Sequence, residues 1–247
     1  LEHPVLEFFS PRAYAVAPPL RSERNLADLL RDRGGALASV TWNGPVPAAM
    51  PAGQRALGAV AEALRLVETE QPGGASRAVE LLDESRRLAP GNRVAQYGAA
   101  IAYRRALESL PTDAAPRRGL AWTLLLMGRH DQALERFREA LLLEPDDPAS
   151  LSGMATVLAS HLNPAKRDPG GALRAARRAV ELTGGSDPRP LVALADAHAS
   201  SGRFDLAAAA AQAALPLAEA LGQKELAGEI RKRLAALPAP APTPSVP

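Results

Sequence analysis

The stretch from Ala114 to Asp147 constrains the fold more than any other part of the chain, because it contains two helix-like patterns joined by one short turn, Gly128-Arg129-His130-Asp131. In each half, apolar side chains recur three and four residues apart, which places them on a single face of a helix. These positions are Leu120, Ala121 and Leu124, then Ala133, Phe137 and Ala140, with Pro145 ending the unit. Small alanines let two helices approach closely, while a large ring fills the space between them. The stretch is therefore predicted to be a helical hairpin.

The same hairpin recurs along the chain. Four positions lie 34 residues before their counterparts in the central hairpin: Ala99, Tyr103, Ala106 and Pro111. Two further hairpins follow, and alanines mark the second helix of each: Ala172, Ala176 and Ala179, then Ala207, Ala211 and Ala214. The step from Ala133 to Ala172 is 39 residues, so about five residues are inserted at His161 to Pro169. A regular period of this length is typical of a helical repeat protein.

The central hairpin resembles the tetratricopeptide (TPR) repeat, whose pattern runs large-x2-Leu-small-x2-aromatic, then Ala-x3-Phe, then Pro. The matching residues are Leu120, Ala121, Leu124, Gly128, Ala133, Phe137, Ala140 and Pro145. Two positions depart from the pattern: Arg117 stands where a large aromatic is usual, and Leu124 replaces a tyrosine. The resemblance implies an all-α, right-handed superhelical solenoid of TPR-like helix hairpins with helical caps.

Helix boundaries follow from apolar stripes and start signals. Helices are predicted at Ser22–Arg33, Gln54–Thr69, Ser76–Leu88, Asn92–Leu110 and Lys224–Leu237. On Gln54–Thr69 the expected inward stripe is Leu57, Val60, Ala61, Leu64 and Val67. Asn92 is a good N-cap, and Asp147-Pro148 and Asp187-Pro188 each combine an Asp N-cap with Pro at the first helical position. Pro216 is expected to bend or break its helix. Lys224–Leu237 has one apolar and one charged face, as an end cap needs.

Three regions are predicted. Residues 1–50 form an extended segment or linker, 51–237 the helical repeat domain, and 238–247 a Pro-rich tail. The run Pro4, Glu7, Phe8, Pro11 and Arg12 resembles the end of spermidine-synthase-like (aminopropyltransferase-type) domains, which would make 1–50 the tail of a missing upstream domain. An irregular or vector-derived leader is the alternative. The start at Leu1 suggests a fragment. Trp42 is expected to anchor an extended segment rather than bind a ligand.

Composition excludes several kinds of partner and site. A net charge of +2 is too small for nucleic-acid binding, and no apolar run reaches the roughly 18 to 20 residues of a membrane span. The chain has no cysteine, which rules out disulfides and thiolate metal sites. This favours a reducing compartment such as the cytoplasm and is compatible with the periplasm too.

No motif indicates catalysis. The four histidines, at His3, His130, His161 and His198, show no metal-ligand spacing and are expected to be structural. The Gly-Gly pairs read as helix ends rather than phosphate loops. We therefore expect no enzyme activity, no catalytic residue, no metal and no cofactor.

The TPR resemblance implies a binding groove lined by the first helix of each hairpin. Carried over by position, its residues are Arg118, Trp122 and Leu125, then Ser152, Thr156 and Ser160, then Arg189 and Asp196. Trp122 beside Arg118 has the chemistry of an interface hot spot, although packing of Trp122 against the adjacent hairpin is the alternative. Lys166 and Arg167, in the inserted loop, are further contact candidates.

The predicted function is a non-catalytic interaction scaffold that binds a protein or peptide partner in this groove. Two alternatives stay open. In the first, the chain is the assembly region of a bacterial, membrane-associated, spermidine-synthase-like fusion protein. In the second, it is a homo-oligomer that associates through its concave face or its cap.

Overall fold

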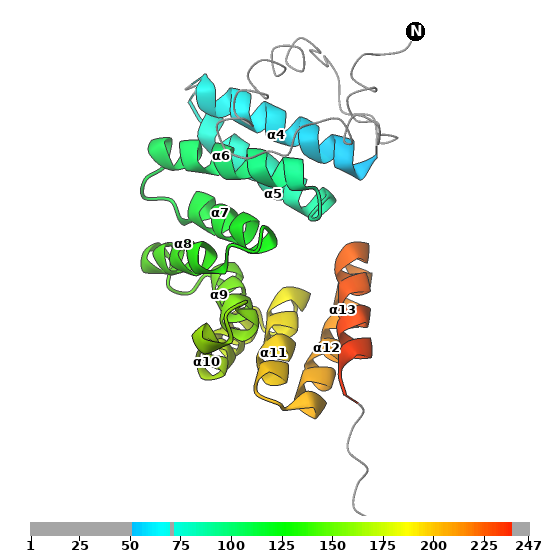
Figure 1. The fold of residues 1–247 in the computed structure, drawn as a ribbon. Coiled ribbons are helices and arrows are strands. Elements are labelled where there is room, and N and C mark those ends of the chain that lie inside the picture. The colour runs from blue at the N-terminus through cyan, green and yellow to red at the C-terminus, as the bar shows by residue number, and fades with distance from the viewer. Residues whose placement is uncertain (1–50, 70–71, 239–247) are drawn as a thin grey trace, which may run out of the picture. The chain divides into compact units, whose positions relative to one another are not determined.

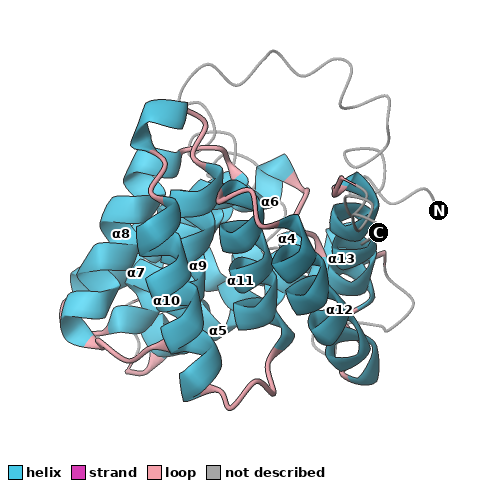
Figure 2. Ribbon diagram, turned by 90° about the horizontal axis from the view of Figure 1, so that it is seen from below, coloured by secondary structure: helices cyan, strands magenta, loops and turns pink. Residues whose placement is uncertain are grey.

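A computed structural model describes residues 51–69 and 72–238, which form ten α-helices and one short 3-10 helix, with no strand in these ranges (Figures 1 and 2). The chain divides into two compact units, at residues 1–127 and 128–247. The prediction of an all-α fold of TPR-like hairpins is confirmed. The predictions for residues 1–50, including the spermidine-synthase-like run, the helix at 22–33 and Trp42, lie outside the described residues, as does the tail from 239.

The first unit contains four described helices: α4 (Ala52–Glu68), α5 (Gly74–Leu88), α6 (Arg93–Ser109) and α7 (Ala114–Leu126). Helix α4 packs against α5 and α6, while α7 packs against both α6 and α5. Leu82, Tyr103 and Leu124 are the largest side chains buried between them, with at most 2% exposure.

The second unit contains α8 (His130–Leu143), α9 (Pro148–Ser160), the 3-10 helix η1 (Pro164–Lys166), α10 (Pro169–Leu182), α11 (Pro188–Ser200), α12 (Phe204–Ala220) and α13 (Lys224–Ala236). Each α-helix from α8 to α12 packs on the next one along the chain. Helices α9 and α11, the first helices of successive hairpins, also touch one another.

Side-chain caps start five of the ten described α-helices, and the sequence analysis names three of these caps. Asn92 accepts a hydrogen bond from the Ala95 N–H at 3.1 Å, Asp147 one from the Ser150 N–H at 2.9 Å, and Asp187 one from the Arg189 N–H. Each bond satisfies a backbone donor that has no partner inside the helix. The predicted start signals are therefore confirmed, and helix ends agree with the sequence analysis to within about two residues.

An aromatic ring packs directly on a glycine of the next helix in each unit. The Tyr103 ring of α6 lies against Gly119 of α7, and a Cβ built on Gly119 would sit 2.3 Å from that ring. Phe137 of α8 lies in the same way against Gly153 of α9, where the Cβ would be 2.1 Å from the ring. Both pairs repeat at the 34-residue period. Each ring therefore occupies the space that a side chain would fill on the facing helix, so the two helices approach closely and leave no cavity between them.

Alanine replaces both members of this pair in the later hairpins. Ala176 of α10, which stands where the earlier repeats carry the ring, shares a buried cluster with Ala193 of α11. Ala176 is fully buried and Ala193 is 1% exposed. Loss of the ring thus coincides with a β-carbon on the facing helix, which keeps the space between the helices filled.

Two local predictions need correction. Pro216 was expected to bend or break its helix, and the break does not occur, because α12 continues through Pro216 to Ala220. Pro216 has no N–H to donate to the carbonyl of Gln212, and both residues lie on the exposed side of α12, where water can replace that bond. On the opposite side Ala214 and Ala218, before and after the proline, are fully buried and hold the helix in place. On α4, the helix face with the smaller side chains packs inward. Leu57, Ala61 and Leu64, which were predicted to face the core, are only half-buried. The residues that α4 buries are Ala56, Val60, Ala63, Leu66 and Val67.

Gly153→Ala should lower the free energy of unfolding by roughly 1 to 3 kcal/mol, because the new methyl group overlaps the fully buried Phe137 ring. Gly228→Ala in α13 is the matched control. Nothing lies within 4 Å of a Cβ at that position, so the change should stabilise the protein by up to about 1 kcal/mol. Urea unfolding followed by circular dichroism measures both. Equal stability of Gly153→Ala and the wild type would contradict the ring-on-glycine packing.

Candidate peptide-binding face

Trp122 lies at the contact between the first helices of two successive hairpins. Its side chain is half-buried on α7, as are those of Arg118 and Leu125 on the same helix. The guanidinium carbon of Arg86, from α5, lies 5.8 Å from the centre of the Trp122 ring. That distance is within the range of a cation–π contact. The structure therefore places an aromatic ring and a stacked arginine on the face formed by α5 and α7, and sequence reasoning missed Arg86.

A buried tyrosine holds Arg86 in this position. The Tyr103 hydroxyl donates a hydrogen bond of 2.7 Å to Asp83, and the same Asp83 oxygen accepts one of 3.2 Å from Arg86. Burial, and then the negative charge of Asp83, raise the pKa of Tyr103 well above its ordinary value. The phenol thus remains a donor over the physiological range. Three helices contribute to one chain of contacts, from Tyr103 of α6 through Asp83 and Arg86 of α5 to Trp122 of α7.

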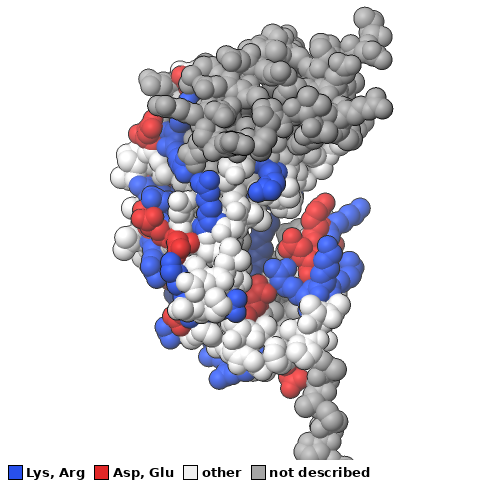
Figure 3. Space-filling model, in the orientation of Figure 1, with Lys and Arg blue, Asp and Glu red and all other residues white. Residues whose placement is uncertain are grey.

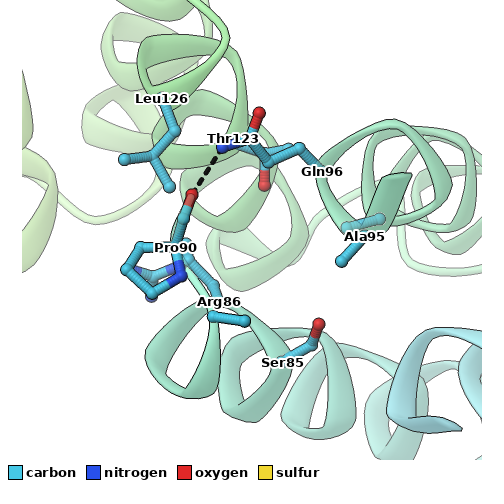
Figure 4. A pocket seen from close by; sticks show the side chains of 9 residues that line it. Ser85, Arg86, Pro90, Ala95, Gln96, Thr123 and Leu126 are labelled. Carbon is cyan, nitrogen blue, oxygen red and sulfur yellow. Dashed lines mark hydrogen bonds between the residues drawn. The ribbon is translucent and has the colours of Figure 1, made fainter. Parts of the chain in front are cut away.

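A small hollow adjoins Arg86 (Figure 4). It encloses about 230 Å³, including space open to solvent, and is lined by the end of α5, the start of α6 and the last turns of α7. The Gln96 side chain donates a hydrogen bond to the Pro90 carbonyl across it, and the Thr123 hydroxyl donates one to the Gly119 carbonyl. The buried Nε of Arg86 has no hydrogen-bond partner among the residues that the structure describes. The remaining lining is mostly aliphatic: Ala89, Pro90, Ala95, Ala99 and Leu126.

Arg117 explains how the repeat tolerates an arginine where TPR sequences usually carry a large aromatic. Its guanidinium donates to the carbonyls of Asp113, at 2.8 Å, and Pro111, at 2.6 Å. It therefore ties the loop before α7 to the helix by hydrogen bonds instead of by apolar packing.

The groove candidates of the second unit are differently placed. Ser152 of α9 is 1% exposed, and its hydroxyl donates to the Pro148 carbonyl. Thr156 and Ser160 donate in the same way to the carbonyls four residues earlier, at 3.0 and 2.7 Å. Arg189 is half-buried. These hydroxyls keep acceptor capacity, but Ser152 offers little surface to a partner.

Asp196 of α11 is bound by the C-terminal helix. The Nε of Arg233 in α13 donates to Asp196 at 3.0 Å. Burial raises the pKa of Asp196, and the charge of Arg233 opposes that effect. Arg233 itself is half-buried. The rest of α13 follows the prediction, with Ile230 fully buried and acidic and basic side chains mixed on its outer side (Figure 3).

Lys166 and Arg167 of the inserted loop make internal contacts. Lys166 pairs with Asp131 at 2.6 Å, and the Nε of Arg167 donates to the His161 carbonyl at 2.9 Å. The structure also brings together two of the histidines that sequence spacing had separated, His130 and His161. Within the described ranges, no group of three or more His, Asp or Glu side chains is arranged to hold a metal ion. No helix in these ranges is long and apolar enough to cross a membrane.

Comparison with known proteins identifies the repeat. A sequence model of the family described as "Tetratricopeptide repeat" matches residues 102–157. No curated protein matches the chain. The residues matched include the ring-on-glycine pairs from Tyr103 to Gly153, so the predicted TPR resemblance is confirmed for this segment. The match therefore identifies a tetratricopeptide-repeat segment within an all-α fold of helical hairpins.

Several solved structures are similar. The MamA protein has 18% identity and a TM-score of 0.43, over 66% of this chain and 90% of MamA. YrrB, described as a TPR protein with an unusual peptide-binding site, has 14% identity and a TM-score of 0.41, over 85% of this chain and all of YrrB. Yeast Tom70 has 14% identity and a TM-score of 0.43, over 90% of this chain and 45% of Tom70.

Tyr103→Phe should lower the free energy of unfolding by about 1 to 3 kcal/mol, because Asp83 loses a part-buried hydrogen bond. The variant should also lose the part of the pH dependence of stability that the Tyr103 phenol causes at alkaline pH. A raised phenol pKa stabilises the fold fully below about pH 10 and less as the pH rises through the folded-state pKa, since ionisation is then favoured on unfolding. Urea unfolding at neutral and alkaline pH measures both, with Tyr97→Phe on the same helix as the control. Equal losses in the two variants would contradict the Tyr103–Asp83 contact.

Proposed function

We propose that this chain is an interaction scaffold that binds a peptide segment of a protein partner on the face formed by α5 and α7. The observation that carries the proposal is the Arg86 guanidinium stacked at 5.8 Å over a half-buried Trp122. A half-buried tryptophan keeps part of its ring available, and the stacked arginine fixes that ring before a partner arrives. Fixing a side chain in advance lowers the entropy lost on binding.

The neighbouring side chains suit an extended peptide. Arg118 lies one helical turn before Trp122, and Leu125 lies three residues after it, so all three share one side of α7. Tryptophan and arginine are the residues that most often dominate interface energies. Helix α7 carries two arginines and no acidic residue between Ala114 and Leu126, which favours a partner with a carboxylate near its apolar anchor.

The remaining candidates belong to the second unit, and their partner contacts are proposed for that unit by itself. Thr156 and Arg189 are half-buried and can contribute polar contacts there. Asp196 contributes through its pair with Arg233, and Ser152 only through the shape of α9, because its side chain is buried. Lys166 and Arg167 are exposed at the inserted loop, where each already makes an internal contact that a partner would have to replace.

The test compares two double variants, each of which removes one arginine and one large apolar side chain. Arg118→Ala with Trp122→Ala deletes the proposed contacts, and Arg138→Ala with Leu142→Ala deletes an exposed arginine and leucine, also four residues apart, from the second helix α8. A partner is captured with the intact chain, purified, and titrated against each variant by calorimetry. The first variant should weaken binding by roughly 30-fold or more, the equivalent of about 2 kcal/mol, and the second should leave it unchanged.

Equal affinities for the two variants would overturn the assignment of this face. Recovery of a second copy of this chain as the captured species would show that the face serves self-association. Circular dichroism of both variants confirms that the helices remain folded.

A further inference from the structure

The inserted loop (161–168), between α9 and α10, is fixed by two histidine rings that accept hydrogen bonds. The backbone N–H of Leu162 donates to Nδ1 of His130, at the start of α8, with a distance of 3.2 Å. The backbone N–H of Asn163 donates to Nδ1 of His161 at 3.1 Å. Both rings therefore act through an unprotonated Nδ1, and each holds one of two successive loop residues.

Charged groups from α8 and the loop surround these rings. Oδ1 of Asp131 lies 3.3 Å from Nε2 of His161 and 2.6 Å from Nζ of Lys166. Nε of Arg167 donates to the His161 carbonyl. The two rings meet edge to face, with centroids 5.3 Å apart and an angle of 85° between their planes. His161 is only 3% exposed, so its ring has little water to replace a lost contact.

We propose that the inserted loop is an acid-released latch, closed while His130 and His161 are neutral and opened when they take up protons. A proton on Nδ1 turns each acceptor into a donor that faces another N–H donor, so both loop contacts are lost. Two imidazolium rings at this separation also repel one another. The nearest compensation is Asp131, which is already paired with Lys166.

The pKa shifts of His130 and Asp131 agree with a latch that opens in weak acid. Burial, and then the neighbouring His161, lower the pKa of His130, with Asp131 acting in the opposite sense. The hydrogen bond from Lys166 lowers the pKa of Asp131, which therefore stays ionised in weak acid. Because protonation of His130 is harder in the closed state, the latch is most stable above about pH 6.5 and is lost as the pH falls through the lowered pKa.

Opening would change the surface that the loop presents. In the closed state Lys166 is bound by Asp131, and Arg167 by the His161 carbonyl, while Leu162 is 70% exposed. Release of the loop frees both cations from these contacts. The latch thus makes the contact candidates of the loop available to acidic partners in weak acid but not at neutral pH. This inference does not depend on the α5–α7 face.

Amide hydrogen exchange of the intact chain tests the latch directly. Protection of the Leu162 and Asn163 amides, corrected for the chemical pH dependence of exchange, should fall on the order of tenfold between about pH 7.5 and pH 5. Amides in the interior of α9 should keep their protection, which separates loop opening from unfolding of the unit. Unchanged protection of Leu162 and Asn163 would overturn the proposal.

Asparagine variants identify the sensor. His130→Asn and His161→Asn each keep an oxygen acceptor near the place of Nδ1 but do not titrate in this range. Each variant should reduce the pH dependence of loop protection, and the double variant should abolish it. His198→Asn is the control, since His198 is another buried histidine, on α11, whose pKa burial lowers. Full pH dependence in the double variant, or its loss in His198→Asn, would also overturn the proposal.

Discussion

The close approach of α6 to α7, and of α8 to α9, depends on an aromatic ring that occupies the place of a missing side chain. Tyr103 packs on Gly119, and Phe137 packs on Gly153, so that a Cβ at either glycine would overlap the ring. Such a contact fixes both the separation and the rotation of the two helices, because a ring fits only where the facing helix has no β-carbon. The repeat is therefore defined by complementary shapes on neighbouring helices as well as by apolar stripes.

The same contact supports the candidate binding face. Tyr103 carries a hydroxyl where the next repeat has Phe137, and that hydroxyl binds Asp83, which in turn binds Arg86. Arg86 then lies over Trp122. The packing of α6 on α7 and the orientation of side chains on the α5–α7 face are thus linked through one part-buried hydrogen bond. A change in the core is expected to reach the binding face through these contacts, without moving either helix.

Local sequence rules predicted the repeat register, the helix ends and caps such as Asp147, because these depend on residues close together in the chain. Gly153 could have been found in the same way, since it lies 34 residues after the glycine that faces Tyr103. The stack of Arg86 on Trp122 could not, because it depends on how two helices are rotated against one another. The pairing of His161 with a residue of α8 depends likewise on the path of an inserted loop. At Pro216 the local rule failed because packing on both sides maintains the helix.

Nuclear magnetic resonance of the two glycines tests the central claim most directly. A proton that lies over an aromatic ring is shifted upfield by the ring current. The account predicts upfield-shifted Hα resonances for Gly119 and Gly153, with nuclear Overhauser effects to the rings of Tyr103 and Phe137 respectively. Ordinary Hα shifts at both glycines, with no Overhauser effect to either ring, would contradict it.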